Sequence, residues 1–451
     1  MTGDIQPVKP VRSHQSSPLH GTIRVPGDKS ISHRALMFGA MAVGETKVTG
    51  LLEGEDVLST AAAMRALGAS VERGDDGIWT VRGRGVGGFS EPTGVLDMGN
   101  SGTAARLLMG ILATQSFTTF MTGDASLCSR PMERVMTPLR PIGVGFVSRS
   151  KGRMPLAIQG TDAPMPITYE LPVASAQVKS AVMLAGLNAP GKTTVIEPNP
   201  SRDHTEKMLT HFGAEVVVEE QENGGRVITL TGQPELVARD VIVPTDPSSA
   251  AFPVVAALIT PGSDITVEAV GMNPLRTGLF TTLKEMGAKI TALNTRVEAG
   301  EEVADLKVEY SELHGVTVPA NRAPSMIDEY PVLAVAASFA KGTTHMEGLE
   351  ELRVKESDRL AVVVESLKAC GIDVEEGESS MTVVGTGEPA LGGGEIKSRL
   401  DHRIAMSFIV FGMASQKPVS IDDAAPIDTS FPGFSDLMNG LGAKIKETAN
   451  S

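Results

Sequence analysis

Cysteine is almost absent from this chain of 451 residues, since only Cys128 and Cys370 occur and they lie far apart. Two distant cysteines exclude a disulfide framework and suit a reducing compartment. The chain also has no apolar run long enough to cross a bilayer, and its first residues contain no hydrophobic core of a signal peptide. We therefore expect a cytoplasmic protein with no membrane partner.

Positive charge is scarce as well, because 54 acidic residues outnumber 40 lysines and arginines and leave a formal net charge of −14. A nucleic-acid partner needs a basic face, so this balance argues against one. An acidic protein can still hold a compact basic pocket for a small anion. His204 and His211 lie seven residues apart with no third ligand nearby, so no metal site is expected.

The length and a hydrophobic content of 41% indicate a soluble globular protein of two domains. An apolar residue, a glycine and a small or apolar residue recur six times, each time after a helical pattern and before a β-like alternation. The glycine stands where a helix C-cap lies, because only glycine takes the left-handed conformation freely. The spacing of about 70 to 84 residues predicts six α/β units. The six glycines are Gly68, Gly143, Gly213, Gly287, Gly371 and Gly442.

The domain boundary is expected at residues 241–247, where a strand-like end meets a proline-containing linker between the third and fourth units. The expected N-terminal domain then spans residues 27–244 and the C-terminal domain spans residues 245–451. Residues 1–26 join the C-terminal domain if the strand-like segment at 22–25 belongs to it. The chain would then cross a second time at Pro26–Gly27.

The stretch from Pro26 to Arg34 places two cations and two hydroxyls directly before an apolar helical run. Asp28 or Ser30 can cap this helix, and its free N–H groups would then face the same space as Lys29 and Arg34. An anion site and an ordinary capped surface helix both fit this segment alone. Similar polar starts beside a cation recur along the chain, which suggests that helix N-termini of both domains face a shared, positively charged cleft. They lie at 100–106, 175–177, 201–203, 353–359 and 401–403.

The motifs at 26–34, 99–106, 130–132, 353–359 and 400–403 closely resemble those of the 5-enolpyruvylshikimate-3-phosphate synthases, colinearly from about Leu19 to Lys444. The resemblance implies an α/β fold of two inside-out α/β barrel domains with three βαββαβ-type units each, which agrees with the repeat count. It implies transfer of the carboxyvinyl group of phosphoenolpyruvate to the 5-hydroxyl of shikimate 3-phosphate, with release of phosphate, in aromatic amino-acid biosynthesis. No cofactor or metal is implied, and a monomer is expected.

The resemblance also implies which residues hold the substrates. Both substrates carry phosphate and carboxylate groups, which arginine binds with a bidentate fork and lysine with a compact charge. The implied ligands of shikimate 3-phosphate are Lys29, Ser30, Arg34, Ser175, Gln177, Arg202, Asp328 and Lys355. Those of phosphoenolpyruvate are Lys29, Asn100, Gly102, Thr103, Arg130, Gln177, Arg359 and Arg403.

The resemblance also implies proton transfer by Glu356, Asp328 and Lys29. Glu356 would deliver and remove the proton of the methyl group, Asp328 would face the 5-hydroxyl, and Lys29 would share in the transfer. Plainer alternatives stay open: Asp328 could cap a helix at 332–340, and Glu356 could form an ordinary i,i+3 pair with Arg359 on a solvated face. A repeat scaffold that binds anions without turnover is the non-enzymatic alternative.

Departures from the family pattern look like its second sequence class. Many members have a C-terminal lysine that reaches phosphoenolpyruvate, whereas residues 428–432 here contain none. Ala176 replaces one of two serines, and an aromatic position after Ser201 is replaced by 202–204. Gly102 leaves room for the herbicide glyphosate at the phosphoenolpyruvate position, so inhibition by glyphosate is expected.

The two cysteines do not favour the related UDP-N-acetylglucosamine enolpyruvyl transferases. That family uses a loop cysteine as an acid, but its position would align with Ala125. Cys128 is expected in a loop two residues before Arg130. Cys370 fills the apolar slot before a repeated glycine, so a role in core packing is expected.

Overall fold

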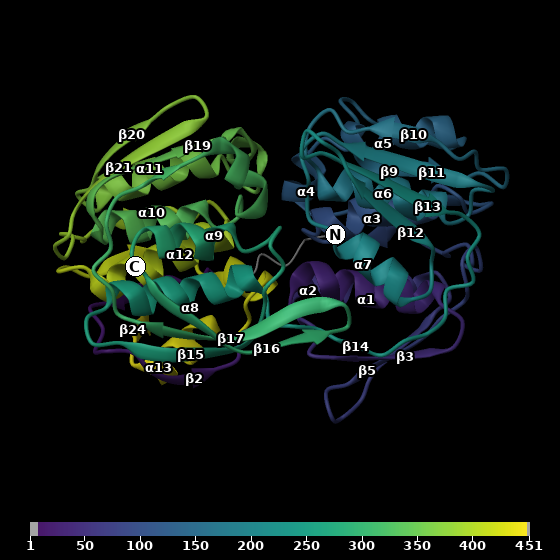
Figure 1. The fold of residues 1–451 in the computed structure, drawn as a ribbon. Coiled ribbons are helices and arrows are strands. Elements are labelled where there is room, and N and C mark those ends of the chain that lie inside the picture. The colour runs from purple at the N-terminus through teal and green to yellow at the C-terminus, as the bar shows by residue number, and fades with distance from the viewer. Residues whose placement is uncertain (1–7, 449–451) are drawn as a thin grey trace. The chain divides into compact units, whose positions relative to one another are not determined.

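A computed structural model describes residues 8–448, which form two compact units (Figure 1). The N-terminal unit contains Gly27–Val243 together with Glu298–Glu301. The C-terminal unit contains the described residues up to Pro26, Pro244–Val297 and the residues from Glu302 onward. Among residues 8–448, no helix has the length and apolarity that a membrane crossing requires.

Each unit has three four-stranded sheets, and each sheet has one parallel pair of strands at its edge. The N-terminal sheets are, in order across each, β14 (Val241–Ile242), β3 (Glu45–Thr49), β5 (Trp79–Arg82), β4 (Ser70–Arg73); β6 (Leu96–Asp97), β7 (Thr118–Thr122), β9 (Arg153–Gln159), β8 (Gly145–Arg149); and β10 (Thr168–Glu170), β11 (Lys192–Glu197), β13 (Arg226–Thr231), β12 (Val216–Glu220). The C-terminal sheets are β16 (Lys289–Glu298), β17 (Glu301–Glu309), β15 (Asp264–Gly271), β2 (His20–Ile23); β18 (Thr317–Val318), β19 (Lys341–Glu347), β21 (Ser380–Thr386), β20 (Asp373–Glu376); and β22 (Glu395–Ile396), β23 (Val419–Ile421), β1 (Val11–His14), β24 (Lys444–Glu447).

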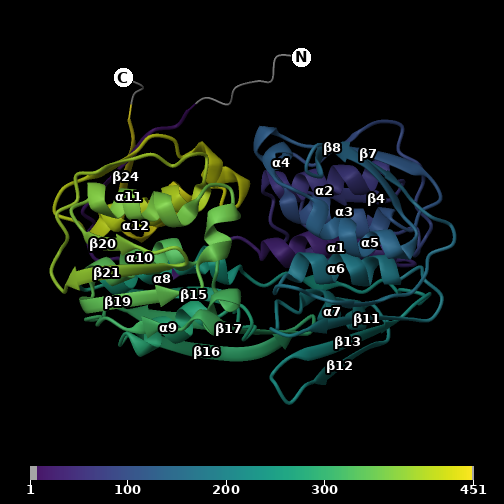
Figure 2. The same cartoon turned by 90° about the horizontal axis from the view of Figure 1, so that it is seen from above.

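Three long helices form the centre of each unit, with the sheets outside them (Figure 2). Every residue of α8 is buried, and an apolar surface on all sides is typical of a helix inside a core. The central helices are α1 (Lys29–Met41), α3 (Gly102–Leu112) and α6 (Ala176–Gly186) in the N-terminal unit, and α8 (Pro247–Ile259), α10 (Tyr330–Phe339) and α12 (His402–Ala414) in the C-terminal unit.

The other helices lie around the central ones and connect the strands. Their α-helical members are α2 (Glu55–Ala66), α4 (Ala125–Ser129), α5 (Glu133–Leu139), α7 (His204–His211), α9 (Gly278–Glu285), α11 (Arg359–Ala369) and α13 (Phe434–Leu441). The 3-10 helices are η1 (Arg140–Ile142), η2 (Ala320–Ser325), η3 (Glu350–Val354) and η4 (Ala425–Thr429).

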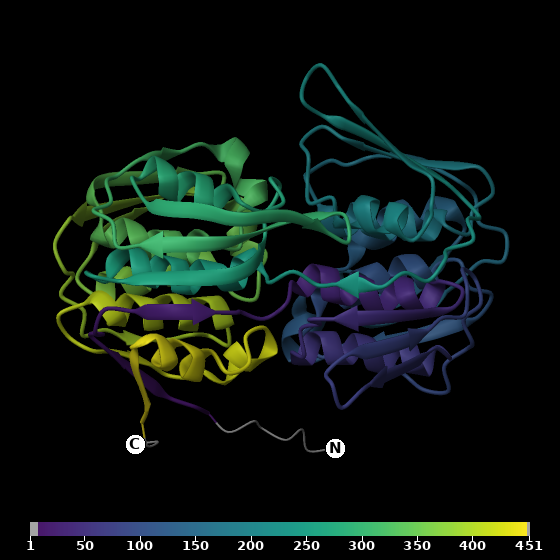
Figure 3. The same ribbon diagram turned by 60° about the horizontal axis from the view of Figure 1, so that its bottom comes forward.

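Two N-terminal strands complete sheets of the C-terminal unit. β1 pairs antiparallel with both β23 and β24, so that Val11 lies opposite Ile421 on one side and Glu447 on the other. β2 pairs parallel with β15 and contacts α13, and Figure 3 shows this purple strand among the later elements. The chain therefore enters the N-terminal unit after Pro26, leaves it after Val243 and contributes to it again at Glu298–Glu301.

The prediction of six α/β units is confirmed by the six sheets and by the six repeated glycines. All six glycines have a positive φ, from +80° at Gly371 to +120° at Gly442. Each follows a helix, as predicted for the C-terminal position that favours glycine.

The structure agrees with the predicted environment of Cys370 and differs from that of Cys128. Cys370 is fully buried, and burial raises the pKa of its thiol to about 11, as suits a packing residue. The prediction of a loop for Cys128 was wrong, because this residue lies in α4. The Asp124 carboxylate accepts the backbone N–H of Leu127 at 2.7 Å and so caps a short helix that the sequence pattern did not reveal.

Candidate functional site

The start of α1 carries the first group of predicted residues. The Asp28 carboxylate accepts the N–H of Ile31 at 2.8 Å, so Asp28 and not Ser30 caps this helix. Lys29, the first helical residue, forms an ion pair with Asp56 of α2, and its side chain remains 23% exposed. The N-terminus of α1 therefore presents a partly accessible cation at the positive end of the helix dipole.

Arg34 lies one turn further along α1 and is almost completely buried. Its guanidinium donates to Thr205 Oγ1 and to Ser180 Oγ, both at 2.8 Å, and to the carbonyl of Ser30 at 2.9 Å. These bonds fix the orientation of Arg34 from α7, α6 and its own helix. Arg202, two residues before the first residue of α7, is half-buried.

The start of α3 carries a second group of predicted residues. Ser101 caps the helix by accepting the N–H of Ala104 at 3.2 Å. The amide of Asn100 donates to Asp124 at 2.6 Å and accepts from Arg130 Nη2 at 2.8 Å. A Cβ atom added to Gly102 would lie 3.2 Å from Arg130 Nη1. The first turn of α3 therefore lies directly against the guanidinium of Arg130.

Gln177, in the first turn of α6, joins α6 to α3. Its Nε2 donates to Thr103 Oγ1 at 3.0 Å, and its Oε1 accepts from Arg106 Nη1 at 2.5 Å. Ser175 caps α6 by accepting the N–H of Val178 at 3.4 Å. Arg106 lies in the motif at 99–106, but the resemblance implies no role for it. Its spacing of four residues from Gly102, which places both on one helix face, was the available signal.

A buried ionic cluster behind α6 was not predicted. Lys179 is fully buried, and its Nζ lies 2.9 Å from Glu197 Oε2 and 2.7 Å from Glu206 Oε1. Burial raises the pKa of Glu206, although the charge of Lys179 opposes this shift. The cluster joins α6 to β11 and α7, and no sequence motif marks it because its partners are far apart in the chain.

Arg359 is the centre of a cluster in the C-terminal unit. Its side chain is 1% exposed and donates to Asp401 at 2.8 Å, to Asp328 at 3.1 Å and to Glu356 at 2.5 Å. The i,i+3 pair with Glu356 therefore exists, but the alternative of a solvated face is wrong for Arg359 because it is buried. Asp401 is itself fully buried and caps α12 by accepting the N–H of Arg403 at 3.0 Å.

Asp328 takes part in this cluster and does not cap α10. Glu329 occupies the N-cap position, without a side-chain bond to the helix, so the capping alternative for Asp328 is wrong. Asp328 Oδ1 lies 3.1 Å from Arg359 Nη1 and 3.7 Å from Lys355 Nζ. Arg403 Nη1 donates to the Asp328 carbonyl at 3.3 Å. The structure thus brings together Asp328, Lys355, Glu356, Arg359 and Arg403.

The two clusters differ in charge. The starts of α1 and α3 hold the cations Lys29, Arg34, Arg106 and Arg130. Lys29 pairs with Asp56, and Asp124 accepts from the amide of Asn100. In the C-terminal cluster, the carboxylates Asp328, Glu356, Asp401 and Glu329 face three cations, with Glu329 3.8 Å from Arg403. The N-terminal cluster is therefore suited to anions, and the C-terminal cluster offers carboxylates that can exchange protons beside cations.

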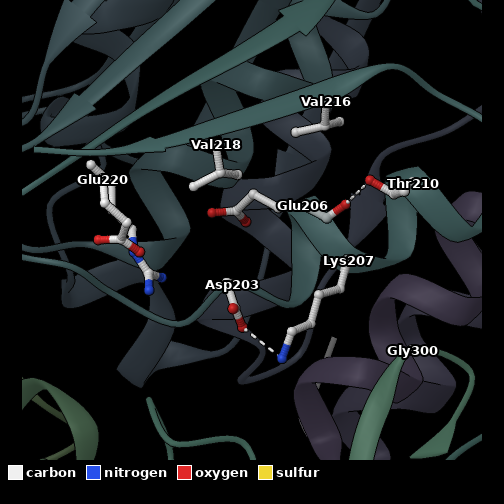
Figure 4. Close-up of a pocket in the computed structure, with 9 residues that line it drawn as sticks. Asp203, Glu206, Lys207, Thr210, Val216, Val218, Glu220 and Gly300 are labelled. Carbon is white, nitrogen blue, oxygen red and sulfur yellow. Dashed lines mark hydrogen bonds and ion pairs between the residues drawn. The ribbon is translucent and has the colours of Figure 1, made fainter.

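Two hollows lie elsewhere, and none of the predicted site residues lines them. One of about 470 Å³ lies between α7 and β12, where Lys207 pairs with Asp203 at 3.4 Å (Figure 4). Another of about 680 Å³ lies at the C-terminal ends of α8, α10 and α12. Among residues 8–448, no group of three or more histidine, cysteine, aspartate or glutamate side chains could hold a metal ion.

The chain is similar to known proteins over nearly its whole length. A family model described as EPSP synthase (3-phosphoshikimate 1-carboxyvinyltransferase) matches residues 13–438. The 3-phosphoshikimate 1-carboxyvinyltransferase of Paramagnetospirillum magneticum is 66% identical over 437 residues, which cover 97% of this chain and 98% of that protein. The one of Rhodospirillum rubrum is 60% identical over 443 residues, with coverage of 97% and 98%.

Solved structures show the same similarity. An EPSP synthase from Acinetobacter baumannii has a TM-score of 0.87 at 46% identity and covers 98% of this chain and 100% of that one. The enolpyruvyl transferase NikO from Streptomyces tendae has a TM-score of 0.78 at 17% sequence identity. The match covers 99% of this chain and 100% of that one. The latter comparison shows the fold alone.

Proposed function

The chain belongs to the EPSP synthase family, and we propose that the two clusters described above supply its 3-phosphoshikimate 1-carboxyvinyltransferase activity. The enzyme transfers the carboxyvinyl group of phosphoenolpyruvate to the 5-hydroxyl of shikimate 3-phosphate and releases phosphate. The reaction is a step of the shikimate pathway and of aromatic amino-acid biosynthesis. The 5-hydroxyl oxygen adds to C2 of phosphoenolpyruvate while its methylene carbon gains a proton, and the adduct then loses that proton and expels phosphate.

The N-terminal cluster holds phosphoenolpyruvate in this proposal. Arg130, fixed by Asn100 against the first turn of α3, supplies a cation beside the N-terminus of that helix. Gln177, fixed by Thr103, supplies a neutral donor, and Gly102 leaves space for the carbon skeleton. Lys29 contacts both substrates, and Arg359 and Arg403 of the C-terminal cluster complete the set for phosphoenolpyruvate.

Shikimate 3-phosphate is held by hydroxyls and cations at the starts of α1 and α6. The buried bonds of Arg34 to Thr205 and Ser180 support a fixed orientation of its guanidinium. The full set of proposed ligands is Lys29, Ser30, Arg34, Ser175, Gln177, Arg202, Asp328 and Lys355.

Proton transfer is proposed for Glu356 and Asp328, with Lys29 sharing in it. Asp328 accepts the proton of the 5-hydroxyl during addition, and Glu356 gives a proton to the methylene carbon and takes one back during elimination. One observation carries this assignment: the buried guanidinium of Arg359 contacts both carboxylates, at 3.1 Å and 2.5 Å. A shared cation holds the two carboxylates close together, so both can face the same substrate atoms.

Other properties follow from the family pattern as proposals. The chain is of the second sequence class, with residues 27–244 and 245–451 as its N-terminal and C-terminal enolpyruvyl-transferase domains and with residues 1–26 joining the latter. Residues 428–432 contain no lysine to match the C-terminal one of many family members, and Asp428, in η4, pairs with Lys9 at 2.8 Å. Phosphate binding then depends more on Lys29, Arg130 and Arg359, or on another group that takes the place of the lysine. A cytoplasmic monomer is proposed, which suits two free cysteines.

Phosphate release from phosphoenolpyruvate is the direct test, and it must depend on shikimate 3-phosphate. Glu356→Gln should abolish this release and leave the binding of shikimate 3-phosphate largely intact. Glu365→Gln is a matched control, because Glu365 lies on α11 in an exposed pair with Arg399 and is expected to keep wild-type rates. A wild-type protein that binds both substrates tightly and releases no phosphate would support the non-enzymatic scaffold instead.

A further inference from the structure

Arg106 contacts the carbonyl oxygen of a side-chain amide that the proposed reaction uses. Arg106 lies on α3, is 7% exposed, and donates from Nη1 to Gln177 Oε1 at 2.5 Å. The nitrogen of the same amide donates one N–H to Thr103 Oγ1 at 3.0 Å. Gln177 is therefore held at both ends by side chains of one neighbouring helix.

An amide can bind an anion only through its nitrogen, because its oxygen accepts hydrogen bonds and repels negative charge. If the amide of Gln177 were flipped, its N–H groups would face the guanidinium of Arg106, which has donors and a positive charge but no acceptor. Thr103 gives no such discrimination, since a hydroxyl can either donate or accept. The orientation of this amide is therefore decided at its contact with Arg106.

We propose that Arg106 is a positioning residue, which fixes the amide of Gln177 so that its second N–H is presented to phosphoenolpyruvate. The inference rests on the proposed function of Gln177 as a ligand of that substrate. Arg106 then acts through Gln177 and does not itself bind phosphoenolpyruvate. Its Nη1 lies 3.7 Å from the position that a Cβ of Gly102 would take, so direct binding is the rival role that the experiment must exclude.

A double-mutant cycle separates the two roles, because residues that act through one another are not additive. The dissociation constant of phosphoenolpyruvate is measured by titration calorimetry at saturating shikimate 3-phosphate, with Glu356→Gln present in every variant to prevent turnover. In this background, Arg106→Met should weaken binding about tenfold, as expected for a lost charge-assisted hydrogen bond. When Gln177→Ala is already present, Arg106→Met should weaken binding by less than about twofold.

Conservative and control variants complete the design. Arg106→Lys keeps a donor for Gln177 Oε1 and should retain binding within about threefold of the parent. Arg140→Met removes an exposed arginine that pairs with Glu133 in the same unit, and it should not change binding. Melting temperatures of all variants show whether each one folds, and Arg106→Ala takes the place of Arg106→Met in the cycle if Arg106→Met does not fold.

The outcomes distinguish this inference from the proposed function. Effects of Arg106→Met and Gln177→Ala that multiply would overturn the inference, since Arg106 would then act independently of Gln177. Wild-type affinity in Arg106→Met would also overturn it, and so would a loss in Arg106→Lys as large as that of Gln177→Ala. Failure of the proposed function is seen separately, as absence of phosphate release by the protein without Glu356→Gln.

Discussion

Gly102 shows how one missing side chain shapes the proposed phosphoenolpyruvate site. A Cβ at this position would lie 3.2 Å from Arg130 Nη1, so the guanidinium would have to move by a few tenths of an ångström. We predict that Gly102→Ala raises the inhibition constant of glyphosate about tenfold or more, because the methyl group narrows the space and displaces a cation. Steady-state inhibition against phosphoenolpyruvate measures this, and an unchanged constant rejects the steric argument.

His33 predicts a pH dependence of stability. It is fully buried, and its pKa lies well below the usual 6.5 because burial and the charges of Lys29 and Arg34 disfavour its protonated form. Below about pH 6.5 the unfolded chain therefore binds a proton that the native protein does not. The free energy of unfolding should fall as the pH decreases, by up to about 1.4 kcal/mol per pH unit.

Urea denaturation between pH 7 and pH 5 tests this prediction. The variant His33→Gln removes the titrating group, so its stability should depend less steeply on pH than that of the wild type, whatever its absolute value. Equal slopes in the two proteins would show that other groups cause the acid sensitivity.

Residue roles were only partly predictable from the sequence. Asp28 as a cap was one of two local candidates, because a cap and its helix lie within three residues. The burial of Arg359 was not predictable, since its partner Asp401 lies 42 positions further on and only the packing of α11 and α12 joins them. Arg106 was missed for a similar reason: its contact with Gln177 spans 71 positions.

Helix ends were the most predictable elements. All six repeated glycines adopt the left-handed conformation, which is a local property of the chain. The strands were harder to place, because β6, β14, β18 and β22 have only two residues each and depend on a partner strand for their existence. The short helix α4 was missed because a five-residue helix has little periodicity to detect.

The repeated glycines allow a prediction that separates backbone strain at a positive φ from steric crowding of an added Cβ atom. An added Cβ at Gly213 meets nothing within 4 Å, but φ there is +96°, so Gly213→Ala should destabilise the protein by about 1–2 kcal/mol. Gly440, inside α13, is equally uncrowded and has no positive φ, so Gly440→Ala should be neutral or stabilise by up to about 1 kcal/mol. Thermal denaturation compares the two. A Gly213→Ala variant as stable as the wild type, or a Gly440→Ala variant that loses as much stability as Gly213→Ala, would contradict the conformational explanation.

At the scale of the whole chain, β1 joins the two ends of the sequence within one sheet. Its fit against α12 is close: a Cβ on Gly412 would lie 2.7 Å from Ser13 Cβ and 2.9 Å from the Ser13 carbonyl oxygen. We predict that Gly412→Ala destabilises the C-terminal unit by about 1–3 kcal/mol, because α12 and β1 must separate. Chemical denaturation of this variant beside Gly440→Ala provides the comparison, and matching midpoints would mean that β1 tolerates the displacement.

The place of β1 also sets an order for biosynthesis. The ribosome releases β1 first, but its partners β23 and β24 begin only at Val419 and Lys444. All strands of the three N-terminal sheets have been made by Ile242, so those sheets can form while translation continues. Until β23 and β24 have been made, β1 has unpaired edges, and a nascent chain that stops before them is left with an edge strand able to pair with a neighbouring polypeptide.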